Sequence, residues 1–403
     1  MSGDLDSYLI GIDLGTSSVK AVLINGAGKI LDWADEEYGI LSPRSDWAEQ
    51  DPQTWLAASL RVIRRVVEKS KIRPQEVAGL GLAGQMHGLV CVGDDGKALR
   101  PAIIWADRRS KTQLQRLQQK IGLQHLADWT GNPLATGFML PSWLWLTENE
   151  PQLAAKTRYL LLPKDYLRLQ LTGKVGSEPS DASSTLLFDP HTRNWSLPLL
   201  EAINLSPDCL PPIYESAGVA GGLLPGMAAA CGLLSGTPVI FGGSDVSLQA
   251  LAQGIVNAGV VSCTIGTGGQ LFAPVSTPIH DPLLRLHLFC HAIPDHWHME
   301  AAILSAGLSL RWLRDRFWPG QSYEVLANMA QEVEAANQGI FFLPYLAGER
   351  TPVMDPTARA AFIGLTLEHG QAHIVRAVME GVVFALRQGL DLMRSLNVPV
   401  NRL

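Results

Sequence analysis

Asp13 stands at the end of an apolar run and is followed by a turn of small and hydroxyl residues, Gly15–Ser18. Such a turn can present backbone N–H groups and hydroxyls to a phosphate, because glycine lets the amides point inward. A neighbouring carboxylate can hold Mg²⁺, which keeps much of its water shell. The alternative is an ordinary tight turn whose hydroxyls bond local backbone groups. The phosphate interpretation assigns Gly15, Thr16 and Ser17 to a bound polyphosphate.

The same layout of apolar run, Gly-Thr turn and apolar run returns at Gly266–Gly269. Aligned on the turn, Gly15 matches Gly266, whereas Asp13 matches Thr264. Two matching hairpins predict a duplicated fold with one phosphate loop in each half, and they weaken the ordinary-turn alternative. Because the acid occurs in the first copy only, we expect it to have a chemical task of its own. The second loop adds three predicted phosphate-binding residues, Gly266, Thr267 and Gly268.

A second aspartate, Asp245, ends an apolar run behind Gly242 and Gly243, which permit close approach of other atoms. A carboxylate there can accept a proton from a hydroxyl that attacks a phosphate, and a positioned general base contributes about 10²–10⁴-fold to such a step. The rest of phosphoryl transfer is charge stabilisation and alignment. The alternative is an aspartate that caps a helix. One residue could do both.

Two further patterns are tested and set aside. Gly79, Gly81 and Gly84 have the spacing of a dinucleotide-binding fingerprint, but a strand and a turn follow them where that fingerprint needs a helix. A histidine-rich stretch invites a zinc interpretation, yet its alternation suits a strand more than a metal site, and it holds no second cysteine. Its members are His287, Cys290, His291, His296 and His298.

The elements that must position these residues follow a mixed α/β plan. A helix is predicted over 51–70, with Asp51 as its N-cap and Pro52 at its first position. Strands are predicted from short apolar runs at 8–15, 18–26, 29–38 and 77–84. A long helix begins at Gln371.

Composition bounds the class of protein. With 403 residues the chain is too long for one core, so two domains are expected. The net charge of −6 argues against a nucleic-acid binder. Residues 216–244 carry no charge, but glycines and prolines interrupt them, which favours strands and turns over a membrane span. Five scattered cysteines fit reduced thiols, so we expect a cytoplasmic protein.

Seven segments together resemble the FGGY carbohydrate kinases and, within that family, the xylulokinases. They are "GIDLGTSSVK", "GLAGQMHG", "LLPKDYLRLQLTG", "GGSD", "IGTGG", "FLPYLAGERTP" and "FIGLTLEHGQAHIVRAVMEG". The resemblance runs over nearly the whole chain. It implies an α/β, actin/hexokinase-like fold, in which two ribonuclease-H-like domains surround a cleft for sugar and ATP–Mg²⁺. The N-terminal domain would cover residues 1–244 and the C-terminal domain residues 245–403.

The resemblance also implies roles for single residues. Asp245 would be the catalytic base, and Asp13, together with Asp245, would anchor Mg²⁺. Gly307 would start the helix that approaches the nucleotide. The sugar would contact Met86, His87, Trp105, Asp107 and Asp245. Without the resemblance, His87 would be interpreted as a hydrogen-bonded core histidine.

The implied activity is ATP-dependent phosphorylation of a ketose, D-xylulose to D-xylulose 5-phosphate. Val246 departs from the family's usual asparagine, so ribulose, another pentulose or a polyol remains an alternative. The chain ends before the glycine-rich loop that binds adenosine in the family, so we expect an incomplete second domain. A non-catalytic sugar-binding remnant is therefore a further alternative. The expected partners are sugar and ATP, without nucleic acid or membrane; a homodimer is compatible with the sequence.

Overall fold

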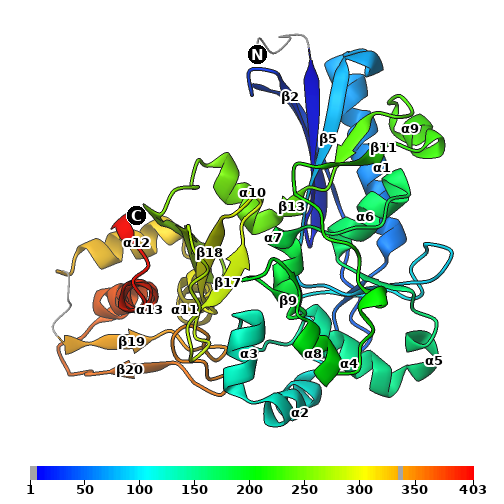
Figure 1. Cartoon of the computed structure of the whole chain (residues 1–403). Coiled ribbons are helices and arrows are strands. Elements are labelled where there is room, and N and C mark those ends of the chain that lie inside the picture. Colours follow the sequence, from blue (N-terminus) through cyan, green and yellow to red (C-terminus); the bar gives the residue numbers. More distant parts are fainter. Residues whose placement is uncertain (1–6, 335–338) are drawn as a thin grey trace. The chain divides into compact units, whose positions relative to one another are not determined.

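The computed structural model of the chain describes residues 7–334 and 339–403 (Figure 1). The chain forms two compact units. Unit 1 contains Met1–Gln253 and Phe289–His296, and unit 2 contains Gly254–Leu288 and Trp297–Leu403. The boundary proposed between 244 and 245 lies immediately before α10 (Asp245–Ala252), which clusters with unit 1. Asp13 and Asp245 therefore belong to the same unit.

Unit 1 is built on a seven-stranded sheet with the order β11-β12-β5-β1-β2-β3, in which β13 also pairs with β5. β2 is antiparallel to its neighbours β1 and β3, and β11 is antiparallel to β12, whereas β5 runs parallel to β1, β12 and β13. The strands are β1 (Tyr8–Leu14), β2 (Ser18–Asn25), β3 (Ile30–Glu37), β5 (Val77–Gly84), β11 (Val219–Gly222), β12 (Pro238–Ile240) and β13 (Gly243–Ser244). The four strands predicted at 8–15, 18–26, 29–38 and 77–84 are confirmed.

Alternation along β1 separates the core from the functional face. Ile10, Ile12 and Leu14 are buried, and α1 (Pro52–Ser70) packs along the sheet with Trp55 also buried (Figure 1). Because successive strand side chains point to opposite faces, Asp13 is directed away from the face that holds these residues. Asp51 caps α1 by accepting the Gln53 N–H at 2.9 Å, which confirms the predicted helix start.

The remaining elements of unit 1 are short. Its other helices are α2 (Lys111–Ile121), α3 (Leu123–Thr130), α4 (Met139–Asn149), α5 (Pro151–Ala154), α6 (Pro163–Thr172), α7 (Pro179–Ala182), α8 (Leu197–Ala202) and α9 (Pro225–Cys231). Three small strand pairs are β4 (Glu49–Gln50) with β7 (Ala102–Ile103), β6 (Val90–Val92) with β8 (Tyr159–Leu161), and β9 (Phe188–Asp189) with β10 (Asn194–Trp195). Single 3₁₀ turns are η1 (Pro74–Glu76), η2 (Ser183–Thr185) and η3 (Pro207–Cys209).

The uncharged stretch at 216–244 forms β11, β12 and β13, as expected, and also the short helix α9. Pro225 starts α9, and Gly232 ends it with a positive φ of 79°. Proline at the first position and glycine past the last one are helix signals that the strand interpretation overlooked. Across the described ranges, no helix combines the length and the apolar character that a membrane crossing requires.

Unit 2 contains a four-stranded sheet with the order β15-β16-β18-β17. Its strands are β15 (Ser262–Ile265), β16 (Gly269–Val275), β17 (His287–Cys290) and β18 (Trp297–Ile303). Its helices are α11 (Gly307–Phe317), α12 (Tyr323–Gln331) and α13 (Gln371–Ser395). Smaller pairs join β14 (Gly259–Val260) with β21 (Val400–Arg402), and β19 (Phe341–Leu343) with β20 (Ala361–Ile363). The predicted long helix from Gln371 is confirmed.

The two units repeat the same hairpin. β15 and β16 are antiparallel, as are β1 and β2, and each hairpin is followed by a third antiparallel strand. The registers differ by one residue at the turn. Leu14 pairs with Val19, whereas Ile265 pairs with Gly269, so the second turn is one residue shorter. The duplicated layout read from the sequence is therefore present.

Candidate active site

Three neighbouring strand ends of unit 1 bring the two predicted aspartates together. In the sheet, Asp13 of β1 lies opposite Ala83 of β5, and Ala83 lies opposite Gly243 of β13. Asp245 follows β13 directly as the first residue of α10. The N-cap of α10 is Ser244, whose hydroxyl accepts the Ser247 N–H at 3.4 Å. Asp245 is therefore not the capping residue, and its carboxylate remains available for chemistry.

Gly242 makes this arrangement possible. Its φ is +81°, and a Cβ at this position would lie 2.0 Å from the Leu82 carbonyl oxygen. Only glycine tolerates both the left-handed conformation and the contact. The close backbone approach expected from the two glycines is thus real at Gly242, where the chain turns against the end of β5.

The environment raises the pKa of Asp245 to about 7. Burial is the main cause; the Val246 N–H, which donates to Oδ1 at 2.8 Å, opposes it, and the negative charge of Asp13 adds to it. Burial also raises the pKa of Asp13, although Lys20, its cross-strand neighbour, lowers it in part. A carboxylate with a pKa near neutrality is well suited to accept and release a proton at physiological pH.

The fit of a magnesium ion can be judged from Asp13. Its Oδ1 atom is buried and accepts no hydrogen bond from any described residue. No group of three or more His, Cys, Asp or Glu side chains in the described ranges could hold a metal ion. Mg²⁺ is usually bound through one or two carboxylates, with water and substrate phosphates as the other ligands. Asp13 fits such an ion, whose shell would be completed by water and phosphate oxygens.

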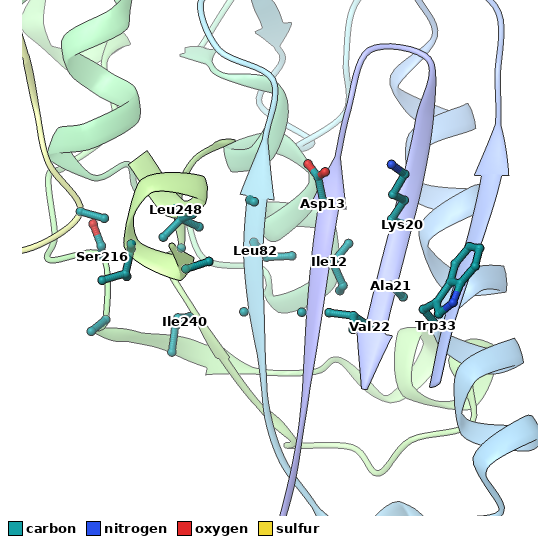
Figure 2. Close-up of a pocket in the computed structure, with 18 residues that line it drawn as sticks. Ile12, Asp13, Lys20, Ala21, Val22, Trp33, Leu82, Ser216, Ile240 and Leu248 are labelled. Atoms are coloured by element: carbon teal, nitrogen blue, oxygen red, sulfur yellow. The ribbon is translucent and has the colours of Figure 1, made fainter. Parts of the chain in front are cut away.

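Asp13 and Lys20 also border a cavity of about 600 Å³ on this face of the sheet. Figure 2 shows Asp13 and Lys20 pointing the same way from adjacent strands, with Trp33 on the next strand. Much of the remaining lining is apolar, including Leu82 and Leu248. The predicted sugar-contacting side chains do not contribute to the lining described here, so this cavity is separate from that set.

In the first predicted phosphate loop, side chains hold the carbonyl groups. The Gly15 carbonyl accepts the Tyr38 hydroxyl at 2.5 Å, and the Thr16 carbonyl accepts Gln50 Nε2 at 2.7 Å. Gln85 Nε2 in turn donates to Gln50 Oε1 at 3.0 Å. Within the described residues, the N–H groups of Thr16 and Ser17 have no acceptor. The loop therefore keeps two donors for an anion, which favours the phosphate interpretation over an ordinary turn.

In the second loop, backbone N–H groups instead of side chains hold the carbonyl groups. Gly307 N–H donates to the Gly266 carbonyl at 2.9 Å, and Ala306 and Leu308 N–H donate to the Thr267 carbonyl at 3.0 Å. A Cβ on Gly307 would lie 2.5 Å from Gly266 O. The first amides of α11 therefore bond the loop instead of facing a ligand.

A cavity of about 270 Å³ adjoins this loop, and Arg311 and Tyr323 contribute to its wall. The N–H groups of Thr267 and Gly268 bond no described residue. The donors that this part of unit 2 can offer to an anion therefore include the two loop amides and the Arg311 guanidinium.

The four side chains predicted to contact sugar, besides Asp245, occupy different environments. Trp105 is 46% exposed, and its Nε1–H donates to Thr16 Oγ1 at 2.8 Å, which ties it to the first loop. Asp107 is buried; its Oδ2 accepts the Ala48 N–H at 2.7 Å and pairs with Arg109 at 2.8 Å. Met86 is buried as well.

His87 combines an unusual backbone conformation with a hydrogen-bonded and stacked ring. Its φ is +72°, and its Nδ1 lies 2.8 Å from the Ser184 carbonyl. The ring stacks on Phe138 with centroids 3.8 Å apart. This contact resembles the core-histidine alternative, but a left-handed conformation in a non-glycine residue is often kept for function. The sugar assignments of His87, Met86, Trp105 and Asp107 stay predictions.

Comparison with known proteins gives the family. Residues 8–252 match the FGGY carbohydrate kinase N-terminal domain, and residues 261–403 match the C-terminal domain. The chain belongs to the FGGY family of carbohydrate kinases. It is 38% identical to the xylulose kinase of Bacillus subtilis (strain 168), over 98% of this chain and 79% of that protein. The xylulose kinase of Escherichia coli (strain K12) is also 38% identical, over 96% and 79% of the two chains.

A solved structure of a xylulose kinase from Brucella ovis superposes on this FGGY kinase with a TM-score of 0.90 and 35% identity, covering 98% of this chain and 80% of that one. The actin/hexokinase-like α/β fold expected from the resemblance is thereby confirmed, and so is the assignment to the sugar kinases.

Sequence reasoning missed several residues that support the site of this FGGY kinase. Gln50 and Gln85 were not singled out, although Gln85 lies in the quoted segment "GLAGQMHG" and Gln50 directly precedes the predicted helix. Charged side chains of the "LLPKDYLRLQLTG" segment were read only as part of a motif. Lys164 and Arg168 there are fully buried. A signal was available in the sequence. Opposite charges at neighbouring positions of a helix, with leucines on either side of them, indicate that the charges are buried as ion pairs.

Proposed function

We propose that this FGGY kinase transfers the γ-phosphoryl group of ATP to the terminal hydroxyl of D-xylulose, giving D-xylulose 5-phosphate and ADP. The observation that carries the proposal is the convergence of Asp245, with its pKa raised to about 7, and Asp13 at the ends of the two strands that flank β5. The two xylulose kinases that share 38% identity with the chain support the choice of sugar.

Asp245 acts as the general base. Val246 N–H holds its Oδ1, and no described residue bonds Oδ2, so Oδ2 is the atom that accepts the proton of the sugar hydroxyl. The hydroxyl oxygen then bonds the γ-phosphorus while the bond to the ADP oxygen breaks. Such a base contributes about 10²–10⁴-fold, because it removes the proton as the oxygen attacks.

The free amides of Thr16 and Ser17 bind phosphate oxygens in unit 1. Within unit 2, the amides of Thr267 and Gly268 are available for the same kind of ligand. Asp13 and Asp245 would hold Mg²⁺. When bound, this ion neutralises the charge that develops on the phosphate oxygens. Gly307 contributes by letting α11 approach the second loop.

The sugar is held by Met86, His87, Trp105 and Asp107. Trp105 is the exposed member and offers an apolar face to the sugar carbons, while its N–H already bonds Thr16. A sugar that contacts Trp105 would therefore affect the first phosphate loop through the hydrogen bond between Trp105 and Thr16. Asp107 keeps Arg109 and the Ala48 backbone in place, so it shapes the pocket through these partners.

A second candidate substrate is another pentulose, such as ribulose, or a polyol. The observation that favours it is Val246, which follows the base and presents an apolar, partly exposed side chain where the resemblance leads us to expect asparagine. Valine cannot hydrogen-bond a sugar hydroxyl.

The five free cysteines suit a reducing compartment, and we propose the cytosol.

The test is ADP release, measured with D-xylulose, D-ribulose, glycerol and gluconate as acceptors. We expect the highest kcat/KM with D-xylulose and a kcat about 10²–10⁴-fold lower in Asp245→Asn, whose melting temperature serves as the folding control. A folded wild-type chain that prefers another acceptor would replace the substrate assignment. ADP release that is equal in the Asp245→Asn variant would remove Asp245 as the base.

A further inference from the structure

Five charged side chains of unit 1 form a network that is fully removed from solvent. Lys164 Nζ lies 2.9 Å from Asp165 Oδ1 and 3.5 Å from Glu178 Oε1. The members of this buried network are Lys164, Asp165, Arg168, Glu178 and Asp181, each with 0% exposure. Replacing buried ion pairs by apolar side chains is often neutral or stabilising. A contribution to stability therefore explains the network poorly. The backbone groups that its side chains bind explain it better.

One branch of the network ends on Phe241, four residues before Asp245. Lys164 Nζ and Arg168 Nη1 both donate to the Phe241 carbonyl at 3.3 Å. The Arg168 guanidinium also lies 4.7 Å from the centre of the Phe241 ring. Two cations on one carbonyl make charge-assisted bonds, which are stronger than neutral ones. This branch fixes the start of the turn that carries the base.

The other branch ends on the residue next to Asp245. Glu178 Oε2 accepts the Ser180 N–H and the Ser180 hydroxyl, both at 2.8 Å. The Ser180 hydroxyl oxygen accepts the Ser244 N–H at 3.0 Å. Glu178 Oε2 also accepts the Ser216 hydroxyl at 2.8 Å, and the Ser216 carbonyl accepts the Gly242 N–H at 2.9 Å.

The charges of the network are balanced by their surroundings. Burial alone would lower the pKa of Lys164, but Asp165, Glu178 and Asp181 raise it above its ordinary value. Burial raises the pKa of Asp181 well above its ordinary value, and the charge of Lys164 opposes this rise. The chain also packs closely here, because a Cβ on Gly84 would lie 2.9 Å from Lys164 Cβ.

We propose that this buried network positions the catalytic base, with Lys164 and Glu178 as positioning residues that act on Asp245 through Phe241, Ser180 and Ser244. The inference rests on the proposed function, in which Asp245 accepts the proton, and adds the groups that set its place. Misplacement of a catalytic group by about 1 Å can cost about 10²-fold in rate. Rigid, charge-assisted bonds around the turn prevent such displacement.

The first experiment removes one hydroxyl from the second branch. Ser180→Ala should lower kcat about tenfold and change the KM values for sugar and ATP less than about twofold, because substrate contacts are untouched. Thr185→Val is the matched control: its buried hydroxyl also donates one bond, to Ala182 O at 2.7 Å, and accepts one, from Leu187 N at 3.1 Å. The control should keep kcat within about twofold. Equal losses in both variants would overturn the proposal.

A double-mutant cycle then asks whether the effect passes through Asp245. In an Asp245→Asn background, Ser180→Ala should lower the residual rate by less than about twofold, since the base is already absent. An unchanged tenfold loss in that background would show a general structural effect and would sink the positioning role.

A third measurement does not depend on turnover. Hydrogen exchange of the peptide covering 241–248 should become about tenfold faster in Ser180→Ala and in Glu178→Gln, and stay unchanged in Thr185→Val. Unaltered exchange in both network variants would contradict the proposal. A wild-type chain without kinase activity would count against the proposed function, while the exchange result would still decide whether the network holds the turn.

Discussion

The β1–β2 hairpin of unit 1 and the β15–β16 hairpin of unit 2 share their strand pairing and their Gly-Thr turn, but different groups hold their carbonyls. Side chains from distant segments, including Gln50 and Tyr38, hold the first turn. Backbone amides at the start of α11 hold the second. Both solutions leave turn amides without acceptors among the described residues. A phosphate loop thus needs its carbonyls tied back, and either kind of donor can do this.

The two hairpins also differ in charge. Asp13 precedes the first turn, and its register partner across the strands is Lys20. The corresponding residue of the second hairpin is Thr264, which is exposed and uncharged. Asp13 and the strand that leads to Asp245 lie on either side of β5, and the charge of Asp13 adds to the rise in the pKa of Asp245. In the proposed mechanism the repeated backbone provides phosphate binding twice, whereas the metal anchor is needed once.

The largest expected effect comes from removing the negative charge that distinguishes the first hairpin at this position. Asp13→Asn should lower kcat about 10²–10³-fold, as losses of single electrostatic groups at active sites do, and should raise the Mg²⁺ concentration for half-maximal rate. Thr264→Asn is the matched control and should change kcat less than about threefold. Magnesium titrations of kcat for both variants provide the measurement. Similar losses in the two variants would refute the special role of Asp13.

The next effect is the pH dependence of the acid pair. Because the pKa of Asp245 in the ligand-free chain is about 7, the base is protonated below this pH, and kcat/KM should fall about tenfold for each pH unit below it. A pH–rate profile of kcat/KM between pH 5 and pH 9 gives the apparent value. A flat profile in this range would separate the rate from the ionisation of Asp245.

The same pKa has the opposite consequence for stability. Folding raises the pKa of Asp245 above 3.8, so its protonated form stabilises the folded state fully below 3.8, and this contribution is lost as pH rises through about 7. Asp245→Asn should therefore gain thermal stability relative to wild type between pH 4 and pH 8. Melting temperatures measured at both ends of that range would reveal a constant difference if the prediction is wrong.

A smaller effect is expected from the backbone-held turn. Gly307→Ala places a Cβ 2.5 Å from Gly266 O, so the second loop must move away from α11. Overpacking of this kind costs about 1–3 kcal/mol, and we expect the KM for ATP to rise about tenfold while the KM for sugar changes little. Gly370→Ala, where a Cβ would meet nothing within 4 Å, is the control. An unchanged KM for ATP in Gly307→Ala would detach this contact from nucleotide binding.

The smallest effect comes from one bond of the side-chain-held turn. Trp105→Phe removes the Nε1–H that Thr16 Oγ1 accepts, and a neutral hydrogen bond is worth about 0.5–1.5 kcal/mol. We expect kcat/KM for sugar to fall about 2- to 13-fold. Trp195→Phe loses an equivalent bond, to Pro211 O at 2.8 Å, and should have no such effect. Equal values for both variants would show that the bond to Thr16 does not matter for the reaction.

Much of the local structure could be predicted because it depends on short-range rules. The Asp51–Pro52 start of α1 follows from the missing N–H of proline and the short carboxylate side chain. The hairpin of β1 and β2 follows from two apolar runs around a glycine turn. The helix α9 was overlooked, since Ala-rich segments between glycines carry little periodicity. Its own Pro225 and Gly232 were the better guide.

Other features depend on residues that are far apart in the sequence. Gln85 and Gln50 meet beside the first turn because β5 pairs with β1 and β4 lies near by, and nothing in their local sequences announces this. The capping role considered for Asp245 fell to Ser244, because a helix boundary is shifted easily by one residue. The sugar assignments rest on family likeness and still await measurement.

The sequence by itself determined the repeated Gly-Thr hairpins, the helix start at Asp51 and the family, because turn chemistry and strand alternation act over a few residues. Tertiary structure alone decided that Asp13 and Asp245 flank the same strand and that Lys164 is buried with its acids. Strand register and burial arise from long-range pairing, and burial is what raises the pKa of Asp245 to about 7. The sequence shows each of these residues, but their pKa values depend on the groups that the fold packs around them.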